Sequence, residues 1–294
     1  MIKKNGMFAI AGRPNVGKST LVNALAGEKV AIVSDKPQTT RNRITAIRNL
    51  DEVQYIFLDT PGFHKPVTRL GKYMNEMVTS SVSDVDAVLL IVEPKARVGK
   101  PESILIDKIK EMKIPALLVI NKIDTVPKEV ILEVITEYEK AHDFEDYIPI
   151  SAKLSDGIEI LFGSLKRFAL EGPPLFPEDR ATDQPDRQIA AEIIREKLLY
   201  TLDKEVPHGV AVVIDEFEER GAVLNISATI YCEKDTHKGI IIGKNGARLK
   251  DVGSMARKDM ERFFGARVFL ETWVKVRENW RQSETQIRNF GFSG

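Results

Sequence analysis

The sequence is short of the features that mark several specialised classes of protein. Cys232 is its single cysteine, so no intramolecular disulfide can form and a cysteine-based zinc cluster is excluded. A chain without disulfides fits a reducing cytosol. Lysine plus arginine and aspartate plus glutamate each number 43, which gives a net charge of zero. The charge of the whole chain therefore predicts no particular class of partner.

Long hydrophobic runs are also missing. Near the N-terminus, two lysines precede a five-residue apolar run at residues 7–11. The core of a signal peptide needs roughly 7–15 apolar residues and a membrane helix about 20, so we expect neither. We find no internal repeat and no low-complexity tract. With 294 residues, of which 43% are hydrophobic and 29% charged, the chain has the length and apolar content for two globular domains.

The strongest chemical signal is a glycine-rich loop that fits the pattern G-x-x-x-x-G-K-[ST]. It comprises Gly12, Arg13, Pro14, Asn15, Val16, Gly17, Lys18 and Ser19. Glycines let the backbone fold closely around an anion, so that successive N–H groups point at phosphate. Lys18 is placed to reach the β and γ phosphates, and Ser19 offers a hydroxyl to Mg²⁺. A helix that begins near Lys18 adds its positive end, and we include Thr20 in the nucleotide-binding set.

Apolar strands and helical patterns alternate over the first part of the chain. Strands are expected at residues 7–11, 43–47, 53–58, 86–92, 116–120 and 147–150, and helices at 103–112, 130–140 and 158–170. Near-continuous apolar strands separated by helices predict an α/β domain with a mostly parallel sheet and helices on both faces. In such a sheet the ligand binds at the carboxyl edge of the strands.

Three further motifs follow predicted strands, at the edge where a ligand is expected. They are Asp59-Thr60-Pro61-Gly62, Asn121-Lys122-Ile123-Asp124 and Ser151-Ala152-Lys153. Asp59 offers a carboxylate to Mg²⁺, and the N–H of Gly62 can meet a γ phosphate. Asp124 can accept hydrogen bonds from N1–H and the exocyclic amine of guanine, a donor pair that adenine lacks. The structural alternative for Asp124 is a helix N-cap. In the third motif, a backbone N–H is expected to meet guanine O6.

These four motifs in this order resemble a GTPase of the translation-factor-related class. The resemblance implies that Thr40, with Thr39 as the alternative, is the switch threonine that closes on Mg²⁺ when GTP is bound. Residues 37–41 resemble the first switch of bacterial ribosome-associated GTPases. On this basis the expected Mg²⁺ ligands are Ser19, Thr40 and Asp59, and the expected catalytic residues are Lys18, Thr40 and Gly62.

The residue after the D-x-x-G motif departs from the Ras-like pattern. In Ras-like enzymes a glutamine there orients the attacking water, whereas this chain has Phe63, which has no group for that task. Hydrolysis is therefore expected to be slow, or to use another group, a monovalent cation or a partner. Asn15 matches an asparagine that helps to hold K⁺ in a related subgroup of GTPases, although a turn residue is the plain alternative. We hypothesise a K⁺ site near Asn15.

A proline-rich segment separates two regions of regular pattern. Residues 171–185 hold four of the chain's 14 prolines, so this stretch cannot continue a helix and should be extended and fairly stiff. We therefore divide the chain into a GTPase domain at residues 1–171, a linker at 172–186 and a second domain at 187–294 that includes a C-terminal extension.

The second domain reads as helix, strand, strand, helical region and strand, with a short helix expected at residues 283–290. Before its longest helix lies a G-x-x-G loop, Gly243 to Gly246. This resembles the loop with which KH domains clamp about four nucleotides, and it predicts a smaller α+β domain of the type II KH class. A glycine-rich helix cap is the alternative.

Local charge agrees with a nucleic-acid partner. From Lys238 to Arg281 there are eleven lysines and arginines against five acidic residues. Such a basic stripe inside a neutral protein is typical of contact with a phosphate backbone. The expected RNA-binding residues are Lys238, Ile242, Gly243, Lys244, Asn245, Gly246, Arg248 and Lys250. The side chains of Phe269, Trp273 and Trp280 can stack on bases, but core or strand-surface positions are favoured.

A bacterial GTPase domain joined to one KH domain resembles the Era family over nearly the whole chain. The resemblance implies GTP and GDP as ligands with Mg²⁺, binding of 16S ribosomal RNA near its 3′ end, and a role in maturation of the 30S ribosomal subunit. It also implies a monomer in the cytoplasm with loose association with the inner membrane. Two alternatives stay open, an RNA-binding module whose nucleotide is structural and a membrane-linked signalling GTPase with incidental RNA affinity.

Overall fold

The computed structural model describes residues 1–36, 39–59, 61, 68–72, 74, 85–203 and 206–292. The chain divides into two compact units. One unit comprises Met1–Ala31, Thr40–Pro66 and Gly71–Asp183, and the other comprises Ile32–Thr39, Val67–Leu70 and Gln184–Gly294. Two short stretches from the N-terminal half of the chain thus belong to the C-terminal unit.

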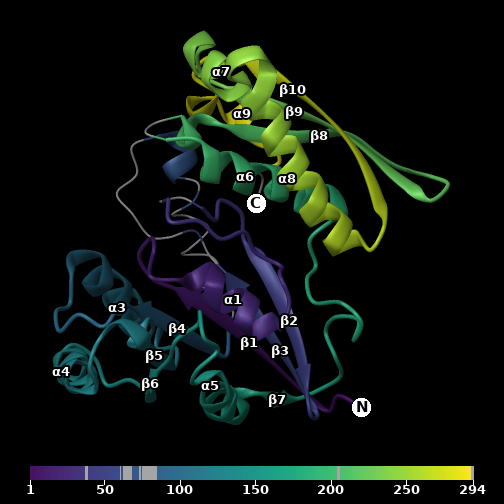
Figure 1. The fold of residues 1–294 in the computed structure, drawn as a ribbon. Coiled ribbons are helices and arrows are strands. Elements are labelled where there is room, and N and C mark those ends of the chain that lie inside the picture. Colours follow the sequence, from purple (N-terminus) through teal and green to yellow (C-terminus); the bar gives the residue numbers. More distant parts are fainter. Residues whose placement is uncertain are drawn as a thin grey trace. The chain divides into compact units, whose positions relative to one another are not determined.

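The first unit is built on a seven-stranded sheet with the order β2-β3-β1-β4-β5-β6, in which β7 also pairs with β1 (Figure 1). Its strands are β1 (Lys4–Ala11), β2 (Ile44–Leu50), β3 (Val53–Asp59), β4 (Ala87–Val92), β5 (Ala116–Ile120), β6 (Asp146–Pro149) and β7 (Leu170–Glu171). The pairs from β3 through β1, β4 and β5 to β6 are parallel, while the β2–β3 hairpin is antiparallel. The predicted α/β class with a mostly parallel sheet is confirmed.

Helices cover both faces of this sheet because alternate strand residues supply two cores. The helices are α1 (Lys18–Ala26), α3 (Lys100–Met112), α4 (Lys128–Glu139) and α5 (Ile158–Leu165). Phe8 and Ile10 of β1 pack with buried residues of α1 and α5. Ala9 and Ala11, whose side chains point the other way, pack with buried residues of α3 and α4. The apolar runs read from the sequence are therefore strands that are buried on both faces.

The last helix of this unit is shorter than predicted. The helix expected to run to Leu170 ends at Leu165, continues as a 3₁₀ turn at Lys166–Phe168, and gives way to strand β7. The reason lies in β1, which pairs with β4 only from Phe8 onward. The earlier residues of β1 need another partner on that side, and β7 supplies it by antiparallel pairing of Leu170 with Asn5.

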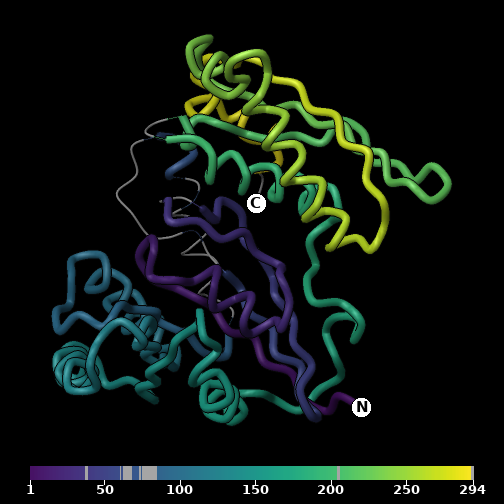
Figure 2. The backbone as a smooth tube through the Cα atoms, in the orientation of Figure 1, coloured from purple at the N-terminus to yellow at the C-terminus, as the bar shows by residue number. Residues whose placement is uncertain are grey.

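The proline-rich segment turns at Pro177–Arg180, so it is not extended throughout as predicted, and it is fastened to the first unit (Figure 2). Gln54 of β3 is fully buried, and its side-chain oxygen accepts hydrogen bonds from the amides of Leu175 at 2.7 Å and Phe176 at 2.9 Å. Thr182 forms an antiparallel bridge with Ala46 of β2. The segment therefore covers the open edge of β2, and the first unit continues to Asp183.

The second unit combines a three-stranded sheet with helices. Its elements are α6 (Asp186–Thr201), β8 (Ala211–Arg220), β9 (Val223–Cys232), α7 (Asp235–Ile242), α8 (Ala247–Phe264), β10 (Arg267–Val276) and α9 (Glu284–Asn289). The sheet order is β10-β9-β8, with β8 antiparallel and β10 parallel to β9. This order of elements confirms the predicted α+β class and the short C-terminal helix.

Trp280 occupies the core position that the sequence analysis favoured over base stacking. Its side chain is fully buried, and its indole N–H donates to the carbonyl of Gly209 at 2.9 Å. It is a core residue that cannot stack on a base, whereas Phe269 and Trp273 of β10 are 53% and 46% exposed. Within the described ranges, no helix is both long enough and apolar enough to cross a membrane.

Candidate nucleotide site and nucleic-acid interface

The glycine-rich loop joins β1 to α1 at the carboxyl edge of the sheet. Gly17 is the N-cap of α1 and has a left-handed backbone, with φ of 96°, and Asn15 is left-handed as well, with φ of 65°. The side chain of Val16 is fully buried in the core, while its carbonyl accepts a hydrogen bond from Asn121 Nδ2 at 2.8 Å. The loop is thus fixed on its inner side, which leaves its backbone to meet phosphates.

Lys18 lies where the loop meets the helix, and it is buried. Its Nζ donates to the carbonyls of Gly12 at 3.1 Å and Arg13 at 3.0 Å. Burial lowers the pKa of Lys18 to about 8, although the negative charge of Asp59 opposes this shift. A bound phosphate group would supply a negatively charged partner for this buried ammonium.

The lowered pKa of Lys18 predicts that GTP binding depends on pH. Above pH 8 the free protein loses the ammonium proton, yet phosphate favours the charged form, so binding must take up a proton there. We expect the association constant of GTP to fall about tenfold between pH 7.5 and 9. Titration calorimetry at pH 8.5, in two buffers of different ionisation enthalpy, measures the uptake. A pH-independent constant with no proton uptake would contradict the prediction.

Three oxygen atoms meet beside the loop. The Oγ1 atom of Thr40 lies 3.0 Å from Oγ of Ser19 and donates to Oδ2 of Asp59 at 3.2 Å. Thr40 and Asp59 are buried, and Asp59 ends strand β3. Hydroxyl and carboxylate oxygens are the ligands that Mg²⁺ prefers, so these residues fit the ion. The structure brings together the three residues predicted as its ligands and places Thr40, rather than Thr39, among them.

The structure describes only some of the other residues predicted at this edge. Pro61 is buried directly after β3, and Thr20 lies in the first turn of α1. Thr60, Gly62 and Phe63 lie outside the described residues, so their assigned roles stay predictions.

The motif Asn121-Lys122-Ile123-Asp124 stabilises both the phosphate loop and the position expected for the guanine base. Asn121 is buried, and its Oδ1 accepts from the amides of Lys122 at 2.8 Å and Ala152 at 3.0 Å. Asp124 is exposed, and its Oδ1 accepts from the Ser151 hydroxyl at 2.7 Å. This hydroxyl orients the carboxylate that is expected to select guanine. The Ala152 amide already donates to Oδ1 of Asn121. A hydrogen bond to guanine O6 must therefore come either from that same amide, shared between two acceptors, or from exposed Lys153.

A charged cluster that no sequence motif indicates lies behind the loop. Glu93 follows β4 and accepts from Lys122 Nζ at 2.6 Å, from Arg13 Nη2 at 2.5 Å and from Lys95 Nζ at 2.9 Å. Burial raises the pKa of Glu93, but hydrogen bonds from Lys122 and Lys95 outweigh it and hold that pKa at about 2. The sequence signal that could have identified Glu93 is its position directly after an apolar strand.

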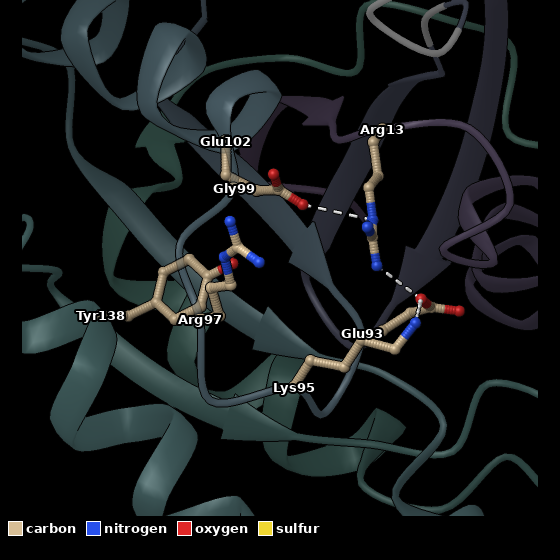
Figure 3. Close-up of a pocket in the computed structure, with 7 residues that line it drawn as sticks. All are labelled: Arg13, Glu93, Lys95, Arg97, Gly99, Glu102 and Tyr138. Atoms are coloured by element: carbon tan, nitrogen blue, oxygen red, sulfur yellow. Dashed lines mark hydrogen bonds and ion pairs between the residues drawn. The ribbon is translucent and has the colours of Figure 1, made fainter.

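Arg13 belongs to this cluster by its side chain. Its Nε lies 3.2 Å from a carboxylate oxygen of buried Glu102, beside a cavity of about 270 Å³ (Figure 3). The cavity is lined by Arg13, Glu93, Lys95, Arg97, Gly99, Glu102 and Tyr138. Arg13 therefore contributes backbone to the loop, and its guanidinium ties the loop to β4 and α3.

The hypothesis of a K⁺ site near Asn15 leads to a prediction about turnover. The Asn15 carbonyl accepts from Lys122 Nζ at 2.7 Å, and its side chain is exposed at the loop. Without a glutamine to orient water, positive charge from a monovalent ion is expected to stabilise the transition state. GTP turnover should be about tenfold faster in KCl than in NaCl. Asn15→Ala should remove this difference, and equal rates of the wild-type protein in both salts would refute the site.

The predicted RNA clamp has an unusual backbone at the head of α8. Gly243, Asn245 and Gly246 have φ of 73°, 52° and 76°, and the four loop residues include a 3₁₀ turn at Lys244–Gly246. A Cβ added at Gly243 would lie 2.8 Å from Cβ of Arg248. The loop therefore requires glycine for its conformation at both ends and for close packing at Gly243.

Exposed basic side chains surround this loop. Lys244, Arg248 and Lys250 are exposed, while Lys238 and Ile242 of α7 are half-buried. The guanidinium of Arg248 donates to the carbonyl of Ile240, which joins the end of α7 to the start of α8. The helix N-terminus and these cations present positive charge on one surface of the second unit.

Comparisons with known proteins address the whole chain. Residues 7–122 match the family model described as 50S ribosome-binding GTPase, and residues 205–281 match the KH domain. GTPase Era of Caldanaerobacter subterraneus subsp. tengcongensis is 48% identical over 100% of this chain and 99% of its own length. The chain belongs to the GTPase Era family. GTPase Era of Ruminiclostridium cellulolyticum is 47% identical over 99% of this chain and 98% of its own length.

Solved Era structures share this fold throughout. A crystal structure of Era in complex with MgGDPNP and nucleotides 1506–1542 of 16S ribosomal RNA has a TM-score of 0.95 and 40% identity, and the match covers both chains fully. Aquifex aeolicus Era bound to GDP and AlF₄⁻ has a TM-score of 0.95 and 41% identity, over 99% of this chain and 100% of that one. Membership of the Era family makes this chain a GTPase, which hydrolyses GTP to GDP and phosphate.

Proposed function

We propose that this GTPase is a switch that binds 16S ribosomal RNA near its 3′ end and assists maturation of the 30S subunit. One observation carries the proposal. A single chain holds both an oxygen cluster suited to Mg²⁺ beside a phosphate loop and a left-handed G-x-x-G loop among exposed cations. Support also comes from the solved Era that contains MgGDPNP and nucleotides 1506–1542 of 16S ribosomal RNA.

The nucleotide half of the proposal assigns a task to each residue. Lys18 leaves the loop carbonyls and bonds the phosphates, where its charge stabilises the transition state. Ser19, Thr40 and Asp59 hold Mg²⁺, which when bound neutralises charge on the β and γ phosphate oxygens. Thr40 senses the γ phosphate, so hydrolysis releases the segment that carries it. Asp124 selects guanine with the Ser151 hydroxyl behind it.

The proposed RNA binding depends on the backbone of the G-x-x-G loop and on the positive charge beside it. Glycines at both ends of the clamp keep side chains away from the RNA backbone, so phosphates reach the amides at the start of α8. Lys244, Arg248 and Lys250 add charge beside it. Ile242 borders the loop as an apolar contact for a base. GTP and GDP are then proposed to give the clamp different affinities for RNA.

The test compares RNA affinity in the two nucleotide states. Fluorescence anisotropy with an oligonucleotide from the 3′ end of 16S ribosomal RNA should give affinities that differ by at least about fivefold between a GTP analogue and GDP. Equal affinities, together with GTP turnover unchanged by the RNA, would overturn the switch. In cells, crosslinking followed by sequencing should recover 16S ribosomal RNA with the wild-type protein, and recovery of other RNA alone would overturn the partner.

Location and assembly form the last part of the proposal. We propose a cytoplasmic monomer that associates loosely with the inner membrane, supported by the family resemblance alone. Flotation with inner-membrane vesicles and analytical ultracentrifugation test these two points. Lys18→Ala separates the switch from an RNA module with structural nucleotide, because only the module would keep its cellular function.

A further inference from the structure

Lys122 joins the guanine motif to the phosphate loop within the first unit. Its Nζ donates to the carbonyl of Asn15 at 2.7 Å, although the two residues are 107 positions apart in the chain. Both have left-handed backbones, with φ of 68° at Lys122 and 65° at Asn15, and such conformations persist only where the surroundings hold them. A lysine side chain is flexible, so the bond between these two positions depends on what else holds the ammonium.

Glu93 is the group that holds it. Its Oε1 accepts from Lys122 Nζ at 2.6 Å, and its Oε2 accepts from Nη2 of Arg13 at 2.5 Å. Figure 3 shows the bond to Arg13. Arg13 lies in the phosphate loop and Lys122 in the guanine motif, so one carboxylate bonds both parts of the nucleotide site. Glu93 comes directly after β4, an inner strand of the sheet, which fixes the point from which its side chain starts.

The surroundings of Glu93 strengthen these two contacts. Its side chain is only 18% exposed, so its ion pairs are screened less than pairs on the surface. With a pKa of about 2, the carboxyl group is charged at neutral pH. Glu93 therefore supplies a permanent negative charge between two cations of the site.

Loss of this charge would fall mainly on Lys122. The cations of Arg13 and Lys122 would lose their shared anion and repel each other. Arg13 would keep its contact with Glu102 at 3.2 Å. Among the residues that the structure describes, Lys122 would keep only its bond to the Asn15 carbonyl.

We propose that Glu93 is a positioning residue that fastens the guanine motif to the phosphate loop and so slows the dissociation of GTP and GDP alike. It acts through Lys122 and Arg13 rather than by touching the nucleotide. Changes within one binding site alter dissociation more than association, so the effect belongs to the rate of release. The inference deepens the nucleotide half of the proposed function, on which it rests, and it does not depend on RNA.

Dissociation rates measured without RNA test this role. Stopped-flow fluorescence at saturating Mg²⁺ follows the release of labelled GDP and of a labelled GTP analogue. Glu93→Gln keeps the size of the side chain but removes its charge. Both dissociation rates should rise about tenfold, with association rates within about twofold of wild type. Glu93→Asp keeps the charge and should raise the rates less than Glu93→Gln does.

Lys95→Met is the matched control. Lys95 Nζ also donates to Glu93, at 2.9 Å, but Lys95 belongs to neither motif and its side chain is 67% exposed. An exposed ion pair contributes little, so this substitution should leave both dissociation rates unchanged.

Several results would overturn the proposal. Glu93→Gln could release both nucleotides at the wild-type rate, change the release of only one of them, or merely lower the fraction of protein that binds nucleotide, as a purely structural role would. Lys95→Met could also raise the rates as much as Glu93→Gln. If wild-type RNA affinity ignores the nucleotide, the proposed switch fails, while these RNA-free rates still decide the role of Glu93.

Discussion

Gly17→Ala is expected to weaken GTP binding by at least about a hundredfold and to abolish measurable turnover. Gly17 has φ of 96°, a conformation that costs alanine about 1–3 kcal/mol. The added Cβ would also overlap Nδ2 of Asn121, the atom that bonds the Val16 carbonyl. Since Asn121 also accepts from Lys122 and Ala152, one methyl group disturbs the phosphate loop and the guanine motif together.

Titration with a fluorescent GTP analogue measures this effect, and Gly163→Ala is its control. Gly163 lies inside α5, and a Cβ added there meets nothing within 4 Å. That substitution should leave GTP binding unchanged and raise the free energy of unfolding by roughly 0.5–1 kcal/mol, because alanine favours helices. A Gly17→Ala protein that binds GTP within tenfold of wild type would show that the loop tolerates a side chain at its N-cap.

The double substitution Gly243→Asp and Gly246→Asp is expected to weaken RNA binding by at least about a hundredfold. Both positions have left-handed φ, so each aspartate is strained. The Cβ at Gly243 also lies too close to Arg248, which must shift. Two carboxylates would then face the phosphate backbone and oppose the charge of Lys244.

Anisotropy with the ribosomal RNA oligonucleotide measures the loss, and thermal unfolding verifies that the variant folds. Gly253→Ala serves as the control, because Gly253 lies in α8 itself and an added Cβ there meets nothing within 4 Å. It should bind RNA as the wild type does. RNA affinity retained by the double variant would place the RNA-binding surface elsewhere on the second unit.

Most of the fold was predictable because its signals are local. Apolar strands buried on both faces, such as β4 and β5, stand out as continuous runs. Motifs at strand ends also predict proximity, because the carboxyl ends of parallel strands share one edge of the sheet. Together with the family resemblance, this rule was enough to group Ser19, Thr40 and Asp59 from the sequence alone.

The features that the sequence did not predict depend on contacts between residues that are distant along the chain. Leu170 continues an apolar pattern after α5, yet it forms a strand because the first residues of β1 lack a partner. Arg195 looks like an ordinary charged residue on a helix, yet it is buried and donates to the carbonyl of Thr39. No periodicity or motif encodes such pairings.

The proline-rich segment has a consequence for solubility. An uncovered edge strand offers unpaired N–H and C=O groups to other chains and promotes aggregation. Ala181 and Thr182 cover part of the edge of β2, because Thr182 forms a bridge with Ala46 and the Ile47 amide donates to the carbonyl of Ala181. A first unit produced alone should therefore end at Asp183. If it ended at Glu171, β2 and the buried Gln54 would be exposed to neighbouring molecules, because the stretch that resembles a tether in the sequence is also a protective cover.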